Sequence, residues 1–295
     1  MNIRILSPSG AIDKELIEGA KERLLSLGWQ VSEGQYARSR SGRFAATDAQ
    51  RAADLNTALT DPSIDVILCA RGGYGLQRIA DKIMPIHKPV VGFSDITVLH
   101  SLAALTATPT LHAIMCKHMA THSLTDEPFA RTIAALRGET MEYSLPAHPL
   151  NRHGEAEGIL IGGNLSVLYG LQGTPYGLNQ SVSETLYSLS AKRPILLIED
   201  IAERHYHIDR MLNNLRLSGV LAQLGGLIVG QFSDCENDPS MGETIYETIA
   251  RYTQEYDYPV VFDFPCGHVE KNMPLWLNKK ARLSVSALGT TLIQA

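Results

Sequence analysis

A serine stands between an apolar run and a helical pattern in the first half of the chain. Residues 89–93 predict a strand, residues 96–105 predict a helix, and Ser94 and Asp95 lie between them. At a sharp strand-to-helix turn, a serine hydroxyl is exposed and the next backbone N–H can face a developing oxyanion. Ser94 is therefore a candidate nucleophile, although Ile96 occupies the place of the last glycine in Gly-x-Ser-x-Gly. The alternative is that Ser94 or Asp95 only caps the helix.

An acid and a histidine follow two apolar runs in the second half. Glu199 comes directly after residues 195–198, and His268 lies in a turn with Gly and Pro after residues 260–262. An imidazole can accept the proton of a serine hydroxyl, and a carboxylate can orient that imidazole. The chain order Ser, Glu, His also occurs among serine hydrolases. Each residue has a simpler alternative, because strand-end acids often cap helices and loop histidines often lie on the surface.

Two adjacent glycines, Gly72 and Gly73, follow the apolar run of residues 64–70. Glycine adopts positive φ without a steric cost, so its backbone N–H can face a ligand as an oxyanion hole requires. A simple strand-to-helix turn would use the same residues. A dinucleotide-binding fingerprint is not supported, because Arg78 stands where Gly-x-Gly-x-x-Gly needs its third glycine.

The cysteines and the other histidines form no recognisable metal-binding pattern. The four cysteines are far apart and include no Cys-x-x-Cys pair, so neither zinc nor a dense disulfide framework is supported. His205 and His207 are two residues apart, which places them on different faces of a helix. His112, His118 and His122 have helical spacing, and we interpret them as core and surface positions of one helix.

The elements that would position these groups alternate between short apolar runs and helical patterns. This alternation is typical of an α/β fold, with a parallel sheet covered by helices on both faces. The candidate residues follow predicted strands, where open α/β sheets concentrate their ligand sites. Thr47 is expected to cap the second helix, with Gln50 completing a capping box. Strands are predicted at residues 3–6, 64–70 and 89–93, and helices at 13–27, 47–59, 76–83 and 96–105.

The pattern changes near Gly138, where a polar, turn-rich segment begins. We expect an N-terminal domain over residues 1–136 with the candidate nucleophile, a linker over 137–156, and a C-terminal domain over 157–295 with the acid and the histidine. Strands are predicted at residues 141–145, 156–161, 195–198, 227–229 and 260–262, a closing hairpin at 281–287 and 290–294, and helices at 208–217 and 244–256.

Composition excludes several classes of protein. The 295 residues carry 26 Lys and Arg against 31 Asp and Glu, and no basic run is longer than two residues, so we expect no nucleic-acid partner. No apolar stretch reaches the roughly 18 to 20 residues of a membrane-spanning helix, so no membrane partner is expected. The first strand is too short for the apolar core of a signal peptide, and a cytoplasmic location is therefore predicted.

An ordered set of short motifs resembles the LD-carboxypeptidases (muramoyltetrapeptide carboxypeptidases), whose relatives include the microcin C self-immunity peptidases. The matching stretches are residues 7–10 (Ser-Pro-Ser-Gly), 44–47 (Phe-Ala-Ala-Thr), 70–75 (Ala-Arg-Gly-Gly-Tyr-Gly), 92–95 (Gly-Phe-Ser-Asp), 158–165 (Gly-Ile-Leu-Ile-Gly-Gly-Asn-Leu), 173–175 (Gly-Thr-Pro), 197–200 (Leu-Ile-Glu-Asp) and 267–268 (Gly-His). Each motif alone is weak, but together they keep the family's order over nearly the whole chain.

The resemblance implies a serine peptidase site between an N-terminal α/β domain and a C-terminal α/β domain richer in β-structure. Ser94 resembles the nucleophile, His268 the general base and Glu199 its orienting partner. A homodimer is implied, and no metal or organic cofactor is required. The turn at Gly72 and Gly73 and the N–H of Asp95 are similar to the family's oxyanion hole.

The implied reaction is hydrolysis of the amide bond between a diamino acid and the terminal D-Ala of a muropeptide tetrapeptide, during peptidoglycan recycling. The diamino acid would be meso-diaminopimelate or L-Lys. A carboxypeptidase must also bind a terminal carboxylate, which calls for a cation or several donors. Arg71 is the first candidate, with Asn164 and Arg204 as further lining residues. The alternative for Arg71 is an ion pair that holds its own loop.

Three other functions remain open at this point. A related peptidase could cleave an aminoacyl-nucleotide substrate with the same three residues. A non-catalytic muropeptide-binding sensor could retain the fold, although all three positions are occupied. A class I amidotransferase-like enzyme would need a cysteine where the chain has Ser94.

Overall fold

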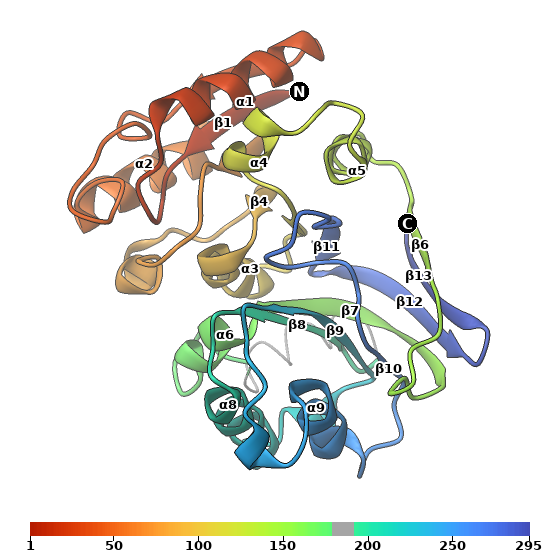
Figure 1. Cartoon of the computed structure of the whole chain (residues 1–295). Helices are drawn as coiled ribbons and strands as arrows, with labels where there is room; N and C mark the ends of the chain where they lie inside the picture. The colour runs from red at the N-terminus through yellow and green to blue at the C-terminus, as the bar shows by residue number, and fades with distance from the viewer. Residues whose placement is uncertain (179–191) are drawn as a thin grey trace.

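The computed structural model describes residues 1–178 and 192–295, and its strands form two sheets (Figure 1). The strands of the first sheet are β1 (Asn2–Leu6), β2 (Gln30–Glu33), β3 (Val66–Cys69), β4 (Val90–Gly92), β5 (Thr110–His112) and β11 (Leu275–Leu277). Their order is β11-β5-β4-β3-β1-β2, and all neighbours are parallel except β11 and β5. The expected α/β class is confirmed.

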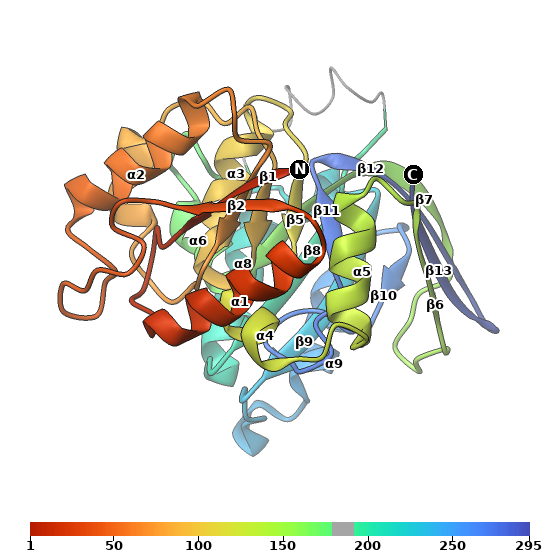
Figure 2. The same cartoon turned by 90° about the horizontal axis from the view of Figure 1, so that it is seen from above.

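Helices cover both faces of this sheet. They are α1 (Lys14–Ser26), α2 (Asp48–Thr60), α3 (Thr97–Ala104), α4 (Cys116–Thr121) and α5 (Glu127–Leu136), with a 3-10 turn, η1 (Gln77–Lys82). Figure 2 shows α1 and α4 on one side of the sheet and α2 and α3 on the other. Ile17 of α1 accordingly shares an apolar cluster with Ile5, whereas Leu55 of α2 packs with Leu6. The predicted capping box of Thr47 and Gln50 is confirmed at the start of α2.

The second sheet is mixed and has seven strands. They are β6 (Met141–Leu145), β7 (Gly154–Asn164), β8 (Ile195–Ile201), β9 (Gly226–Ser233), β10 (Val260–Val261), β12 (Lys279–Ser286) and β13 (Gly289–Gln294). Their order is β10-β9-β8-β7-β12-β13-β6, parallel from β10 to β7 and antiparallel beyond. Its helices are α6 (Leu165–Leu171), α8 (His205–Leu217) and α9 (Ile245–Thr253), with 3-10 turns η3 (Leu221–Gln223) and η4 (Pro239–Met241). The predicted closing hairpin is confirmed as β12 and β13.

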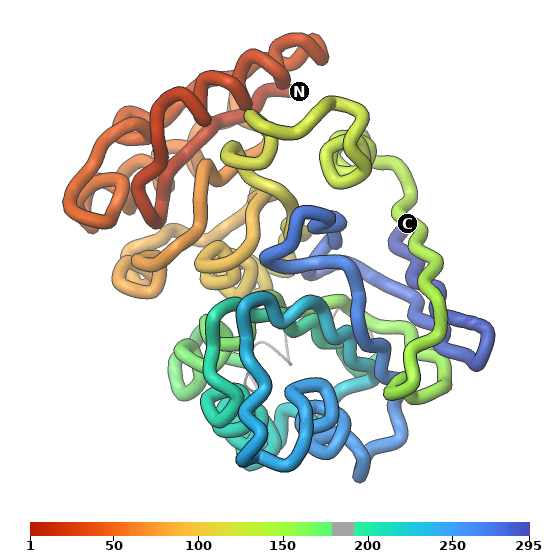
Figure 3. Tube along the Cα trace, in the orientation of Figure 1, coloured from red at the N-terminus to blue at the C-terminus, as the bar shows by residue number. Residues whose placement is uncertain are grey.

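The two sheets share part of their core. One apolar cluster contains Ile5 of the first sheet, Leu197 of the second, and Leu277 of β11. Figure 3 shows the C-terminal part of the chain turning back toward the N-terminal part before it forms the last hairpin. There β11 pairs with β5, with Trp276 opposite Leu111. Segments far apart in sequence therefore hold the two sheets together along a shared boundary, which we call the seam.

The interpretation of His112, His118 and His122 as parts of one helix is wrong. His112 is the last residue of β5, His118 lies in α4, and His122 follows the end of that helix. The three residues of β5 are too few to show a strand periodicity. The sequence therefore shows no strand pattern at His112 that could compete with the helical spacing of the histidines.

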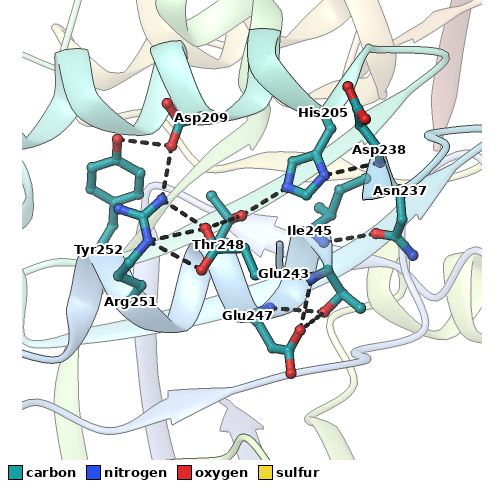
Figure 4. Close-up of polar contacts among 11 residues, drawn as sticks. His205, Asp209, Asn237, Asp238, Glu243, Ile245, Glu247, Thr248, Arg251 and Tyr252 are labelled. Atoms are coloured by element: carbon teal, nitrogen blue, oxygen red, sulfur yellow. Dashed lines mark hydrogen bonds and ion pairs between the residues drawn. The ribbon is translucent and has the colours of Figure 1, made fainter. Parts of the chain in front are cut away.

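A polar network joins α8 to α9 and to the loop that precedes α9 (Figure 4). His205 is buried, and its Nε2 lies 2.8 Å from Thr248 Oγ1. Thr248 Oγ1 donates to Glu243 Oε1 at 2.7 Å, so it accepts from an Nε2–H of His205. The Nδ1 of His205 accepts from the N–H of Asp238 at 3.2 Å. Arg251 also donates to Glu243, which places every member of the network in a hydrogen bond.

We expect Thr248→Val to lower the free energy of unfolding by about 1–3 kcal/mol, because it leaves His205 Nε2 and Glu243 without their shared partner. Chemical denaturation monitored by circular dichroism measures this change. Thr291→Val on β13 is the control, and it should change the free energy of unfolding by less than about 0.5 kcal/mol. Equal stabilities for the Thr248 variant and the wild type would show that the network does not stabilise the fold.

Candidate active site

Ser94 occupies a sharp turn between β4 and α3. The short 3-10 turn η2 (Ser94–Ile96) begins at this residue, directly before α3. The φ angle of Ser94 is 68°, in the left-handed region that costs a non-glycine residue of the order of 1–3 kcal/mol. No side-chain cap is present at the start of η2 or α3. The helix-capping alternative is therefore excluded, and the turn has the geometry of a nucleophile elbow.

The side chain of Asp95 holds this turn against the glycine-rich loop. Its Oδ2 accepts from Ser9 Oγ at 2.5 Å and from the backbone N–H of Leu76 at 2.9 Å. Burial raises the pKa of the Asp95 carboxyl, and the two donors oppose that effect. Asp95 thus ties the turn before α3 to the segment that follows β1 and to the end of the glycine-rich loop.

Gly72 packs directly against Ser94. A Cβ on Gly72 would lie 2.7 Å from Ser94 Cβ and 3.0 Å from its Oγ, so only glycine fits without displacing the serine. Gly73 has a φ of 113°, which also favours glycine. The amides of Gly72 and Gly73 donate to no acceptor within residues 1–178 and 192–295. They are free to bind an oxyanion beside Ser94.

Glu199, within β8, and His268, in the segment between β10 and β11, form a hydrogen-bonded pair. His268 Nδ1 lies 2.8 Å from Glu199 Oε2, and the glutamate is fully buried. Burial alone would raise the pKa of Glu199, but the hydrogen bond with His268 and the nearby ring of His112 outweigh burial and hold that pKa well below its usual range. The carboxylate is therefore ionised at neutral pH. Since Nδ1 of His268 faces this carboxylate, Nε2 is left to accept a proton.

Ser94 and His268 line one cavity of about 500 Å³. The His268 ring packs against Phe93 in a T-shaped arrangement, with ring centroids 4.9 Å apart. No hydrogen bond yet joins Ser94 to His268 in the structure. The other lining residues come from the glycine-rich loop, the β5–α4 region and the turn after His268: Ala70, Arg71, Gly72, Gly73, Met115, Lys117, His118, Ile201, Val269 and Glu270.

The three residues considered for carboxylate binding are not brought together. Arg71 lines the cavity, and its Nη1 donates to the carbonyl of Ala11 at 2.8 Å. Asn164 is buried and caps α6, while its Nδ2 donates to Asp200 at 2.9 Å. Arg204 lines a separate cavity near α8. Of the three, Arg71 alone lines the cavity that holds Ser94.

Three polar lining residues were not anticipated from the sequence. Lys117 and Glu270 are exposed and bring opposite charges to the cavity. Burial lowers the pKa of His118 to about 4, so its ring is neutral at neutral pH. The nearness of Glu270 to His268 along the chain was the one available signal.

Metal chemistry has no evident ligand set in the part of the chain that the structure describes. No three His, Cys, Asp or Glu side chains there are grouped to hold an ion. The four cysteines are free thiols. No helix in that part is long and apolar enough to cross a membrane.

Comparison with known protein families matches both halves of the chain to the two domains of one family. Residues 3–113 match the LD-carboxypeptidase N-terminal domain, and residues 157–283 match the C-terminal domain. A putative carboxypeptidase of Synechocystis is 35% identical, over 97% of this chain and 92% of the relative. A probable murein peptide carboxypeptidase of Bacillus subtilis is 30% identical, over 99% and 91%. A murein tetrapeptide carboxypeptidase of Pseudomonas aeruginosa is 27% identical, over 97% and 94%.

Solved structures show the same fold. The muramoyltetrapeptide carboxypeptidase from Oxalobacter formigenes superposes with a TM-score of 0.85 at 26% identity, covering 100% of this chain and 99% of that one. The microcin C7 self-immunity protein in complex with glutamyl sulfamoyl guanosine gives 0.82 at 20% identity, covering 100% and 96%. The second likeness concerns the fold alone.

We expect Gly72→Ala to lower kcat by at least about 100-fold, because the added Cβ displaces Ser94 and an oxyanion donor. The assay uses a murein tetrapeptide, the substrate named for the Pseudomonas relative. Gly170→Ala in α6 is the matched control, since its Cβ would meet only the flexible end of Gln77 at 3.1 Å. A Gly72 variant that is folded and has the kcat of the control would show that this loop is not part of the site.

Proposed function

The chain belongs to the LD-carboxypeptidase family, and we propose that it is a serine carboxypeptidase acting on murein tetrapeptides. The bond cleaved is the amide between the diamino acid, meso-diaminopimelate or L-Lys, and the terminal D-Ala, as in peptidoglycan recycling. One observation carries the proposal: a serine in a strained strand-to-helix turn shares a cavity with a histidine that is hydrogen-bonded to a buried carboxylate. A homodimer and a cytoplasmic location are part of the same proposal.

In the proposed mechanism, Ser94 Oγ attacks the carbonyl carbon of the diamino acid. His268 Nε2 takes the hydroxyl proton as the C–O bond forms, and Glu199 stabilises the resulting imidazolium. The leaving D-Ala nitrogen then receives that proton from His268. Water then attacks the acyl-enzyme with His268 again as the base, and the tripeptide is released from Ser94. This chemistry needs Ser94 Oγ and His268 Nε2 within about 2.6–3.2 Å, so a hydrogen bond between them must form when substrate binds.

The oxyanion of the tetrahedral intermediate would be bound by backbone donors around the elbow. The N–H of Asp95 follows the nucleophile, as in other nucleophile elbows. The unpaired amides of Gly72 and Gly73 lie on the other side, with Gly72 in contact with Ser94. Fixed backbone dipoles of this kind stabilise developing charge without reorganising during the reaction.

The free carboxylate of the terminal D-Ala requires a cation in the same cavity. Arg71 and Lys117 are the lining residues that carry a permanent positive charge. Arg71 is next to Gly72 in the chain, so it lies beside the proposed oxyanion site. A guanidinium there would select a C-terminal residue over an internal one.

The central experiment incubates purified protein with a diaminopimelate-containing murein tetrapeptide and follows the products by mass spectrometry. We expect loss of one alanine from the tetrapeptide and no change in a pentapeptide that ends in D-Ala-D-Ala. Ser94→Ala should abolish the reaction, because it removes the nucleophile. Ser101→Ala, which removes a hydroxyl farther along α3, should leave it intact.

An intact tetrapeptide after incubation with folded wild-type protein would refute the recycling assignment. Aminoacyl sulfamoyl nucleosides would then be tested next. A Ser94→Ala protein with undiminished cellular function would favour a non-catalytic sensor instead.

The role of Arg71 is tested with a tetrapeptide and its C-terminal amide. Arg71→Ala should lower kcat/KM at least about tenfold for the free acid and much less for the amide, because the amide has no carboxylate to bind. Lys117→Ala in the same assay shows whether the second cation contributes. Equal losses on both substrates would assign Arg71 to holding its loop through Ala11.

A further inference from the structure

The carboxylate of Glu199 has two oxygens, and the acid–base pair uses only one of them. Oε2 bonds to His268, while Oε1 is buried and has no hydrogen-bond partner among the described residues. His112 lies on the other side of the carboxylate, fully buried at the end of β5. Both of its ring nitrogens also lack a partner there, and Nε2 is 3.8 Å from Oε1. A buried acceptor and a buried donor thus face each other just beyond hydrogen-bond distance.

Leaving Glu199 Oε1 and His112 Nε2 unpaired lowers the stability of the fold, and one hydrogen bond between them would satisfy both groups. A buried polar group without a hydrogen bond costs about 1–3 kcal/mol, and more when it is charged. A movement of about 0.8 Å would bring Nε2 to the usual distance of about 3.0 Å from Oε1. The neighbouring His100 cannot take this role, because its nitrogens already bond to Thr110 Oγ1 at 2.9 Å and to the carbonyl of Gly92 at 3.0 Å.

His112 also has a direct structural link to the nucleophile. In the first sheet, His112 of β5 is paired in register with Gly92 of β4, two residues before Ser94. Glu199 instead lies on β8 of the second sheet, and His268 follows β10. A bond between His112 and Glu199 would therefore span the seam between the sheets. It would tie the acid–base pair to the strand pair that carries the serine.

We propose that His112 is a positioning residue: its Nε2–H binds Oε1 of Glu199 and sets the distance between His268 and Ser94. This inference rests on the proposed function of the same site. Glu199 also holds His268, so a bond from His112 to Glu199 fixes the imidazole relative to the strand pair that carries Ser94. No bond of His112 to substrate is involved.

The test compares two substitutions at this position. His112→Phe keeps a ring of similar size but removes the donor, whereas His112→Gln retains an N–H at a similar reach. We expect His112→Phe to lower kcat about 10- to 100-fold, the range for losing a hydrogen bond to a charged group, with KM changed less than about threefold. His112→Gln should recover most of that loss. His205→Phe is the matched control: it removes a buried, hydrogen-bonded histidine of the α8–α9 network and should lower stability without lowering kcat.

A spectroscopic measurement separates this inference from the proposed function. The proton between His268 Nδ1 and Glu199 should give a low-field NMR resonance in the wild type and in His112→Gln, and a shifted or broadened one in His112→Phe. Wild-type kcat and an unchanged resonance in His112→Phe would overturn the role of His112, as would equal losses in the Phe and Gln variants. Wild-type protein inactive on the tetrapeptide would refute the proposed function, while the resonance would still decide whether His112 holds Glu199.

Discussion

The buried negative charge of Glu199 constrains everything around it. A carboxylate removed from water is tolerated only when donors surround it, and here the donors must be side chains of other elements. The backbone near it is built to allow their approach. A Cβ on Gly267 would lie 2.8 Å from Glu199 Oε2, and one on Gly230 would lie 3.1 Å from Glu199 Cβ. Glycine at both places lets β9 and the turn before His268 close around the charge.

The site is assembled from residues of two sheets. The first sheet supplies the serine and the glycine-rich loop, and the second supplies the acid and the imidazole. Their shared apolar cluster and the pairing of β11 with β5 hold the two parts together. The polar groups then meet along the seam, where apolar packing excludes water and strengthens each electrostatic contact. The same packing keeps Glu199 from being solvated, so its ionisation depends on the histidines beside it.

Much of this organisation could be predicted from the sequence, for physical reasons that are local. Ser94, Glu199 and His268 follow apolar runs, and the capping box at Thr47 depends on residues three apart. Long-range pairing had no such signal: β5 and β11 have three residues each, and β11 joins the edge of the sheet by pairing with β5 from far along the chain. His112 was consequently assigned to a helix. An amide such as Asn164 has the same sequence signature whether it caps a helix or contacts a ligand.

The missing bond between Ser94 and His268 has a consequence for the life of the protein in a cell. A serine hydroxyl without a base at hydrogen-bond distance is about as reactive as an ordinary alcohol. Cells contain many activated acyl compounds, such as thioesters and acyl phosphates, and a serine that is activated without its substrate would also react with them. In this chain Ser94 follows β4 of the first sheet and His268 follows β10 of the second, so the reaction proposed above depends on a substrate that contacts both parts. Substrates are then selected at the step in which the Ser94–His268 bond forms, and a protein molecule without substrate stays unreactive.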